Sequence, residues 1–112
     1  MTEENQTSMI DVDTLAAWLQ AGDVDLYDVR EIMEFEAARI PGSTLVPLSI
    51  FDPGAIDTDS PRRIVFHCKS GVRCGMATEI MRASGFAGPI FRLEGGILAW
   101  NAGGGNIQSG KA

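Results

Sequence analysis

The sequence RIVFHCKSGVRCGMATEIMRAS, residues 63–84, decides the fold. Its first five residues form a short, mostly apolar run that is typical of a buried strand. Residues 75–84 repeat apolar side chains at helical spacing, and Gly85 follows them as a stop signal. Between the strand and the helix lies the segment CKSGVR, residues 68–73. The order of strand, tight loop and helix indicates one unit of an α/β protein.

Strand-like and helix-like segments alternate on both sides of this unit. The first helix has Asp13 as its predicted N-cap and Gly22 after its end. The helices are predicted at residues 14–20, 31–38 and 96–101. The extended segments are predicted at residues 24–29, 44–48 and 89–93, and residues 50–61 form a loop with at most one helical turn. This alternation predicts an α/β fold with a mainly parallel sheet covered by helices.

The parallel sheet also predicts where a ligand would bind. In open parallel sheets, ligands bind beyond the carboxyl ends of the strands. Three segments directly follow a predicted strand, and they are residues 28–30, 68–74 and 94–96. We therefore expect a functional site where these three segments meet.

The length of the chain is that of one domain. Its 112 residues leave no room for two independent cores, and a hydrophobic content of 45% is enough for one. Residues 1–8 are polar, and residues 103–112 are rich in Gly, Ser and Asn. Both ends are expected to be flexible, because such segments bury little apolar surface. One domain is predicted for residues 9–102.

Charge and hydropathy exclude two classes of partner. The formal net charge is −6, and the basic residues form no stripe of the kind that binds nucleic acid. Local basic spots at residues 62–63 and 69–73 instead predict a small anionic ligand. The apolar runs are only a few residues long, so no membrane span is expected. The polar, acidic start does not resemble a secretory signal, and we expect a cytoplasmic protein.

The cysteine and histidine content argues against a metal site. Cys68 and Cys74 are the two cysteines, and His67 is the single histidine. These are too few ligands for a zinc site at any usual spacing, and no metal or cofactor is predicted. A structural disulfide is also not expected in a cytoplasmic protein.

Cys68 is the candidate nucleophile. The loop after it enters a helix, whose N-terminus offers unpaired backbone N–H groups and the positive end of the helix dipole. Gly71 allows the curvature that points such groups inward, and Lys69 and Arg73 add positive charge. All of these features favour the thiolate over the thiol, and they also suit an anionic substrate. A buried structural cysteine is the alternative, and the charged loop argues against it.

Other residues near the predicted site have weaker signals. Asp28 and Arg30 stand at a strand end, where they form either a solvated pair or a support for the cysteine loop. Cys74 is predicted to pack, with a resolving or redox role as the alternative. His67 is predicted to pack as well, because neighbouring strand residues point to opposite faces and disfavour a Cys–His pair. The remaining candidates are assigned to core packing, and they are Trp18, Met76, Ile80, Met81 and Trp100.

With these residues in place, the chain resembles the rhodanese homology domain over about residues 9–102. The matching pieces are LYDVRE at 26–31, FE at 35–36, RIPGS at 39–43, VFHCKSGVR at 65–73 and LEGGILAW at 93–100. The resemblance implies a five-stranded parallel sheet flanked by helices on both faces. It also implies that sulfane sulfur passes from thiosulfate or a persulfide, through a Cys68 persulfide, to cyanide or a thiol.

The resemblance also implies roles for the loop. The amides of residues 69–73 (Lys69, Ser70, Gly71, Val72 and Arg73) would cradle the persulfide, and the side chains of Lys69 and Arg73 would attract the donor. Asp28 and Arg30 match a strand-end pair that would stabilise the site. One departure is that Ala38 and Arg39 stand where the family often has Gly-His, which predicts a changed local contact rather than lost activity.

Several alternatives stay open at this point. Related phosphatases place five residues between Cys and Arg, whereas four separate Cys68 from Arg73, so the tighter loop argues against a phosphatase. A persulfide carrier or a protein-docking module remains an alternative to an enzyme with a thiol, cyanide or protein acceptor. Arsenate reduction or a redox switch would use Cys74 together with Cys68.

Overall fold

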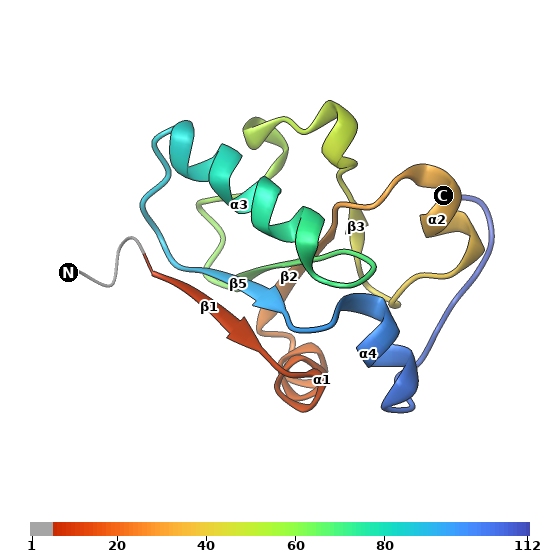
Figure 1. Ribbon diagram of the computed structural model, residues 1–112. Coiled ribbons are helices and arrows are strands. Elements are labelled where there is room, and N and C mark those ends of the chain that lie inside the picture. Colours follow the sequence, from red (N-terminus) through yellow and green to blue (C-terminus); the bar gives the residue numbers. More distant parts are fainter. Residues whose placement is uncertain (1–5) are drawn as a thin grey trace.

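The computed structural model describes residues 6–112, which form a five-stranded parallel sheet. The strands are β1 (Thr7–Ile10), β2 (Val24–Asp28), β3 (Thr44–Leu45), β4 (Arg63–His67) and β5 (Ile90–Leu93). Their order in the sheet is β1-β5-β4-β2-β3, so β4 lies at the centre (Figure 1). The α/β fold with a mainly parallel sheet is confirmed. The predicted strand at residues 63–67 is β4, without any shift of its bounds.

Helices cover both faces of the sheet, as predicted (Figure 1). Phe66 and its neighbours pack against α3 (Val72–Ala83) on one face. Val65 points the other way, towards α1 (Val12–Ala21) and α4 (Gly96–Ala102). The short helix α2 (Ile32–Ala37) follows the carboxyl end of β2. Within residues 6–112, no helix has the length and apolar character that crossing a membrane requires.

Two helices begin earlier than the sequence pattern predicts. The N-cap of α1 is Asp11, whose side chain accepts a hydrogen bond from the Thr14 amide at 2.8 Å, and Asp13 lies inside the first turn. Helix α3 begins at Val72 rather than at residue 75. Gly71 has φ +119°, so the chain reverses there and the helix starts at the next residue.

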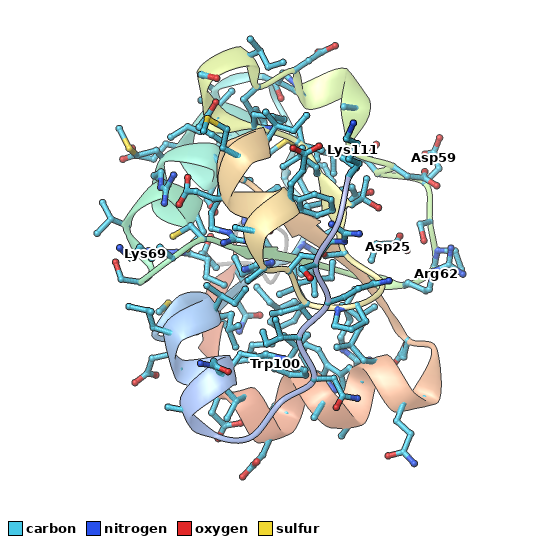
Figure 2. The ribbon with its side chains drawn as sticks, turned by 90° about the vertical axis from the view of Figure 1, so that its right-hand side faces the viewer. Asp25, Asp59, Arg62, Lys69, Trp100 and Lys111 are labelled. Atoms are coloured by element: carbon cyan, nitrogen blue, oxygen red, sulfur yellow. The ribbon has the colours of Figure 1, made fainter. Side chains whose placement is uncertain are left out.

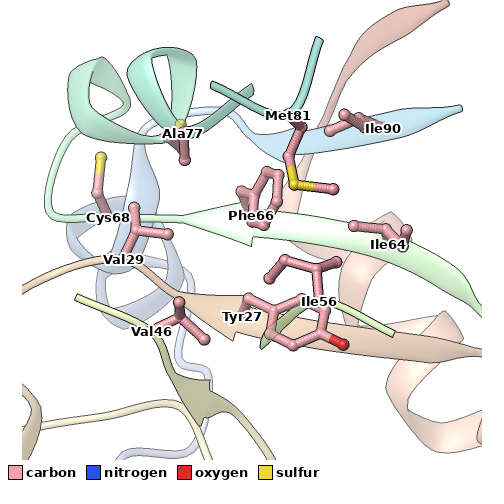
Figure 3. Packing of buried hydrophobic residues seen from close by; sticks show 11 residues of the cluster. Tyr27, Val29, Val46, Ile56, Ile64, Phe66, Cys68, Ala77, Met81 and Ile90 are labelled. Atoms are coloured by element: carbon pink, nitrogen blue, oxygen red, sulfur yellow. The ribbon is translucent and has the colours of Figure 1, made fainter. Parts of the chain in front are cut away.

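The segment between β3 and β4 is mostly loop. Strand β3 is two residues long, and a 3₁₀ turn at Leu48–Ile50 follows it. One further 3₁₀ turn, Pro53–Ala55, lies within the loop predicted at residues 50–61. Phe51 and Ile56 pack against the α3 face of the sheet, so this loop closes one side of the core (Figure 3).

The flexibility of the two end segments stays a prediction, although backbone pairing reaches into both of them. Thr7 and Ser8 belong to β1, which pairs with β5, whereas residues 1–5 lie outside the described residues. The C-terminal segment passes beside α2 (Figure 1). Its backbone exchanges two hydrogen bonds between Gln108 and Arg39, and the Gly110 amide donates to the Glu36 carbonyl at 2.9 Å. Backbone hydrogen bonds therefore fix a tail that has little apolar surface.

The assignment of Met76 to the core is wrong. Its side chain is 49% exposed, whereas Met81 on the same helix is 1% exposed. Met81 lies over Phe66, and Met76 lies on the flank of α3 that the sheet does not reach. Trp100 is buried, and Trp18 packs edge-to-face on Phe91 with ring centroids 5.0 Å apart, so the packing role of both tryptophans is confirmed.

The two methionines provide a test of this packing. We expect Met81→Ala to lower the free energy of unfolding by about 2–5 kcal/mol, because it leaves a cavity over Phe66. Met76→Ala should change that free energy by no more than about 0.5 kcal/mol. Urea unfolding of both variants measures the difference. Equal losses for the two substitutions would contradict the packing of α3 described above.

Candidate active site

Cys68 directly follows β4 at the carboxyl edge of the sheet. The residue is only 1% exposed, and its sulfur points towards the start of α3 (Figure 3). Cys68 Sγ accepts a hydrogen bond from the Gly71 amide at 3.1 Å. One amide of the predicted range, residues 69–73, therefore binds this sulfur, and the cradle for a persulfide stays a prediction.

The loop carbonyls face the opposite way and bind α4. The Ile97 amide donates to the Cys68 carbonyl at 2.9 Å, and the Leu98 amide donates to the Lys69 carbonyl at 3.2 Å. Gly96 makes this approach feasible, because it has φ +59° and a Cβ there would overlap the Cys68 carbonyl oxygen. The segments after β4 and β5 therefore meet, as expected from the parallel sheet.

These contacts make Cys68 a thiolate at neutral pH. The pKa of Cys68 is lowered to about 5 by a hydrogen bond with the Cys74 thiol and by the backbone N–H groups, which together outweigh the effect of burial. The pKa of Cys74 is raised by its hydrogen bond with Cys68 and by burial. One sulfur therefore carries the negative charge, and the other keeps its proton.

Arg73 has a partner that the sequence analysis missed. Its guanidinium binds both carboxylate oxygens of Glu34 in α2, with N–O distances of 2.7 and 2.9 Å. This hydrogen bonding lowers the pKa of Glu34 to about 2. The charge of Arg73 is thus shared with Glu34, and the pair ties α2 to α3. The only local sequence signal for Glu34 is its spacing from Glu31, with which it forms a capping box.

The other loop side chains point outward. Lys69 and Ser70 are exposed, and Figure 2 shows Lys69 at the edge of the molecule. Val72 is 70% exposed. Among the ion pairs of residues 6–112, none includes Lys69, so its charge is available to an approaching anion.

Asp28 and Arg30 form a buried pair rather than a solvated one. Asp28 is fully buried and Arg30 is 4% exposed. Two guanidinium nitrogens of Arg30 donate to the carboxylate, one of them at 2.7 Å, and the same nitrogen donates to the Ala38 carbonyl at 2.6 Å. The pair therefore fixes the end of α2, and it supports the cysteine loop through Glu34 and Arg73.

His67 is part of this buried layer. Its Nε2 lies 3.5 Å from Asp28 Oδ2, and its Nδ1 lies 3.3 Å from the Cys68 carbonyl oxygen. Burial lowers the pKa of His67, so the ring is neutral at neutral pH. Nε2 is buried and has no hydrogen-bond partner within residues 6–112. The ring is fully buried, which agrees with the predicted packing role.

A second basic spot lies at the other end of the sheet. A cavity of about 560 Å³ there is lined by Arg62 and Arg63, at the amino ends of the strands. Both arginines are ion-paired, with Asp25 and Asp23 respectively. Figure 2 shows Arg62 beside Asp25, on the opposite side of the molecule from Lys69. Of the two predicted basic spots, only the cysteine loop thus offers an unpaired cation.

Across residues 6–112, no three His, Cys, Asp or Glu side chains come together in a way that would hold a metal ion.

Comparison with known proteins decides the family. The sequence profile of the rhodanese-like domain matches residues 11–103. The chain belongs to the rhodanese-like domain family. It is 36% identical over 89 residues to the probable adenylyltransferase/sulfurtransferase MoeZ of Mycobacterium tuberculosis, covering 77% of this chain and 22% of that protein. It is 36% identical over 103 residues to the putative sulfur carrier protein YrkF of Bacillus subtilis, covering 88% and 55% respectively.

A solved structure confirms the fold of this rhodanese-like domain. Thiosulfate sulfurtransferase from Pseudomonas aeruginosa superposes with a TM-score of 0.80 at 23% identity, over 95% of this chain and 21% of that one. The chain thus spans between about a fifth and about a half of the length of these three proteins. The similarity therefore concerns one domain of each.

The departure of this rhodanese-like domain at Ala38 and Arg39 has a structural consequence. Arg39 donates to the Gly110 carbonyl at 2.7 Å and to the Phe35 carbonyl at 3.3 Å, and its guanidinium lies 4.8 Å from the Phe35 ring centroid. Arg39 therefore holds the C-terminal segment beside α2, and the expected change of a local contact stays a prediction.

The ionisation of Cys68 predicts its reactivity with pH. We expect the rate of alkylation by iodoacetamide to rise with pH and to reach half its maximum near pH 5, because the pKa of the thiol is lowered to about 5. Peptide mapping should place the label on Cys68, and Cys68→Ser should abolish it. A midpoint near the ordinary thiol pKa of about 8.5 would contradict the cradle.

The close approach of α4 can be tested at Gly96. Gly96→Ala should move the alkylation midpoint of Cys68 to higher pH, because the added methyl displaces the Cys68 carbonyl. Gly104→Ala is the matched control, since Gly104 also has positive φ but has no atom within 4 Å of a Cβ. Both substitutions should cost about 1–2 kcal/mol of stability through backbone strain. An unchanged midpoint in Gly96→Ala would refute the role assigned to α4.

Proposed function

We propose that this rhodanese-like domain is a sulfurtransferase that carries sulfur as a persulfide on Cys68. The observation that carries the proposal is the buried sulfur of Cys68 at the start of α3, which accepts a hydrogen bond from the Gly71 amide. A thiolate is the form of cysteine that attacks sulfur. The same amide would stabilise the terminal sulfur of a persulfide, which is also an anion.

The transfer has two steps that balance without a further oxidant. In the first, Cys68 Sγ attacks the outer sulfur of thiosulfate, a new S–S bond forms, and sulfite leaves with the electron pair of the broken bond. In the second, cyanide or a thiolate attacks the terminal sulfur of the persulfide. Thiocyanate or a new persulfide leaves, and the Cys68 thiolate is restored. A persulfide donor would react in the same way and leave as a thiolate.

The electrostatics around Cys68 suit an anionic donor. Lys69 is the exposed cation of the loop, and the amide dipoles of the α3 N-terminus point at the sulfur. The predicted attraction by Arg73 is weaker than expected, because Glu34 neutralises it. The donor is therefore proposed to be recognised by backbone amides and Lys69.

The names of two relatives support sulfur transfer and leave a second candidate. MoeZ is called a probable sulfurtransferase, and YrkF is called a putative sulfur carrier protein. The second candidate function is therefore a persulfide carrier that delivers sulfur from Cys68 to a protein acceptor. The exposed Val72 and Met76 beside the loop favour an acceptor that makes apolar contact there.

Two further alternatives fit the geometry less well. A phosphatase needs its arginine free for a phosphoryl group, and here Arg73 is bound on both nitrogens by Glu34. Redox chemistry or arsenate reduction needs Cys74 as an attacking thiolate, and the pKa of Cys74 is raised. The geometry therefore favours sulfur transfer over both.

The test of the function is turnover with thiosulfate as donor and cyanide as acceptor. We expect thiocyanate formation by the wild type and only background formation by Cys68→Ser. Dithiothreitol should replace cyanide as acceptor, with sulfide released. Sulfur bound at Cys68 that passes to neither acceptor would favour the carrier. Equal turnover in Cys68→Ser would contradict the proposal outright.

A further inference from the structure

Arg92 lies directly behind the cysteine loop, although nothing in the loop sequence points to it. It belongs to β5 and is partly buried beside the first turn of α3. Its NH2 group donates to the Gly71 carbonyl at 2.7 Å, and its Nε donates to Cys74 Sγ at 3.4 Å. One side chain therefore contacts Cys74 and also Gly71, the residue whose amide donates to the Cys68 sulfur.

The position of the Arg92 side chain depends on a glycine in α3. A Cβ at position 75 would lie 2.8 Å from NH2 of Arg92, which is closer than real Cβ atoms approach. Gly75 stands inside α3, where a glycine weakens the helix by about 1 kcal/mol relative to alanine. The space that Gly75 leaves for the guanidinium explains why a glycine stands inside this helix.

The Cys74 thiol donates to the same carbonyl that Arg92 binds. Cys74 Sγ lies 3.0 Å from the Gly71 carbonyl oxygen, and NH2 of Arg92 lies 2.7 Å from it. A carbonyl oxygen can accept two hydrogen bonds, so Arg92 and Cys74 hold Gly71 together. A guanidinium beside a thiol also makes the thiol a stronger hydrogen-bond donor, because it stabilises negative charge on sulfur.

We propose that Arg92 is a positioning residue for Cys68: together with the Cys74 thiol it fixes Gly71, whose amide donates to the Cys68 sulfur. The relevance of this role to catalysis rests on the proposed function, in which Cys68 must be a thiolate to accept sulfur. It also gives Cys74 a role as hydrogen-bond donor in place of the resolving role considered from the sequence.

Other ionisable groups surround the same sulfur and must be separated from Arg92. They are Lys69 in the loop, Arg73 and Cys74 in α3, Glu34 in α2 and His67 in β4. Of these side chains, Cys74 is the one that Arg92 contacts. An effect of Arg92 on Cys68 should therefore depend on Cys74.

The experiment is a double-mutant cycle read by the pH midpoint of Cys68 alkylation. We expect Arg92→Gln to raise the midpoint by about one unit, and Arg92→Lys to raise it less, because the charge is kept. In a Cys74→Ala background, Arg92→Gln should shift the midpoint by a larger amount, because Arg92 then holds the Gly71 carbonyl alone. Gly75→Ala should raise the midpoint in the same direction as Arg92→Gln, because it displaces the guanidinium.

Arg82→Gln is the matched control. Arg82 is also partly buried and binds backbone carbonyls, those of Phe86 and Gly88, but it lies at the far end of α3. Its loss should lower stability and leave the midpoint unchanged. Far-ultraviolet circular dichroism identifies any variant that is not folded. If Arg92→Gln is not folded, Arg92→Lys and Gly75→Ala test the inference in its place.

Two results would overturn the inference. One is a folded Arg92 variant whose midpoint equals that of the wild type. The other is a shift of equal size with and without Cys74. Alkylation needs no sulfur donor, so these outcomes are independent of sulfur transfer. A chain that fails to transfer sulfur but shows the expected cycle would refute the proposed function and leave the role of Arg92 standing.

Discussion

The structure of the site depends on two hydrogen bonds from the first turn of α4, which bind the carbonyls of Cys68 and Lys69. When the carbonyls of a tight loop are held on one side, its N–H groups must point to the other side. The next N–H along the chain, that of Gly71, donates to Cys68 Sγ. The β5–α4 connection thus shapes a loop that is distant in sequence, and Gly96 is the residue whose missing side chain allows it.

The negative charge at Cys68 is balanced mainly by dipoles. The Cys68 sulfur accepts a hydrogen bond from the Gly71 amide at the start of α3, while Arg73 is bound to Glu34. Fixed dipoles in a buried place are screened little by salt, and they stabilise an anion without binding it as tightly as a guanidinium does. Such a site suits a sulfur atom that must be accepted and then released.

Local sequence was sufficient for the elements whose signal is local. The centre of the sheet, residues 63–67, was predicted in full, because a strand buried on both faces appears as a continuous apolar run. Cys68 and Gly71 were also found from a local signal, which is the charged loop that directly follows this strand. The contacts of Glu34 and Arg92 and the individual hydrogen bonds from α4 were missed. Each of these contacts joins residues that lie 18 to 39 positions apart in the chain. Met76 was misassigned, because helical spacing shows which residues share a face but not how far the sheet extends beneath them.

The measurement that tests the central claim most directly is the mass of the intact protein after exposure to thiosulfate and, separately, to a small-molecule persulfide. The claim is that Cys68 accepts one sulfur atom. It predicts a gain of one sulfur that peptide mapping places on Cys68, that cyanide removes, and that Cys68→Ser does not show. No gain with either donor, or a gain that persists in Cys68→Ser, would contradict it.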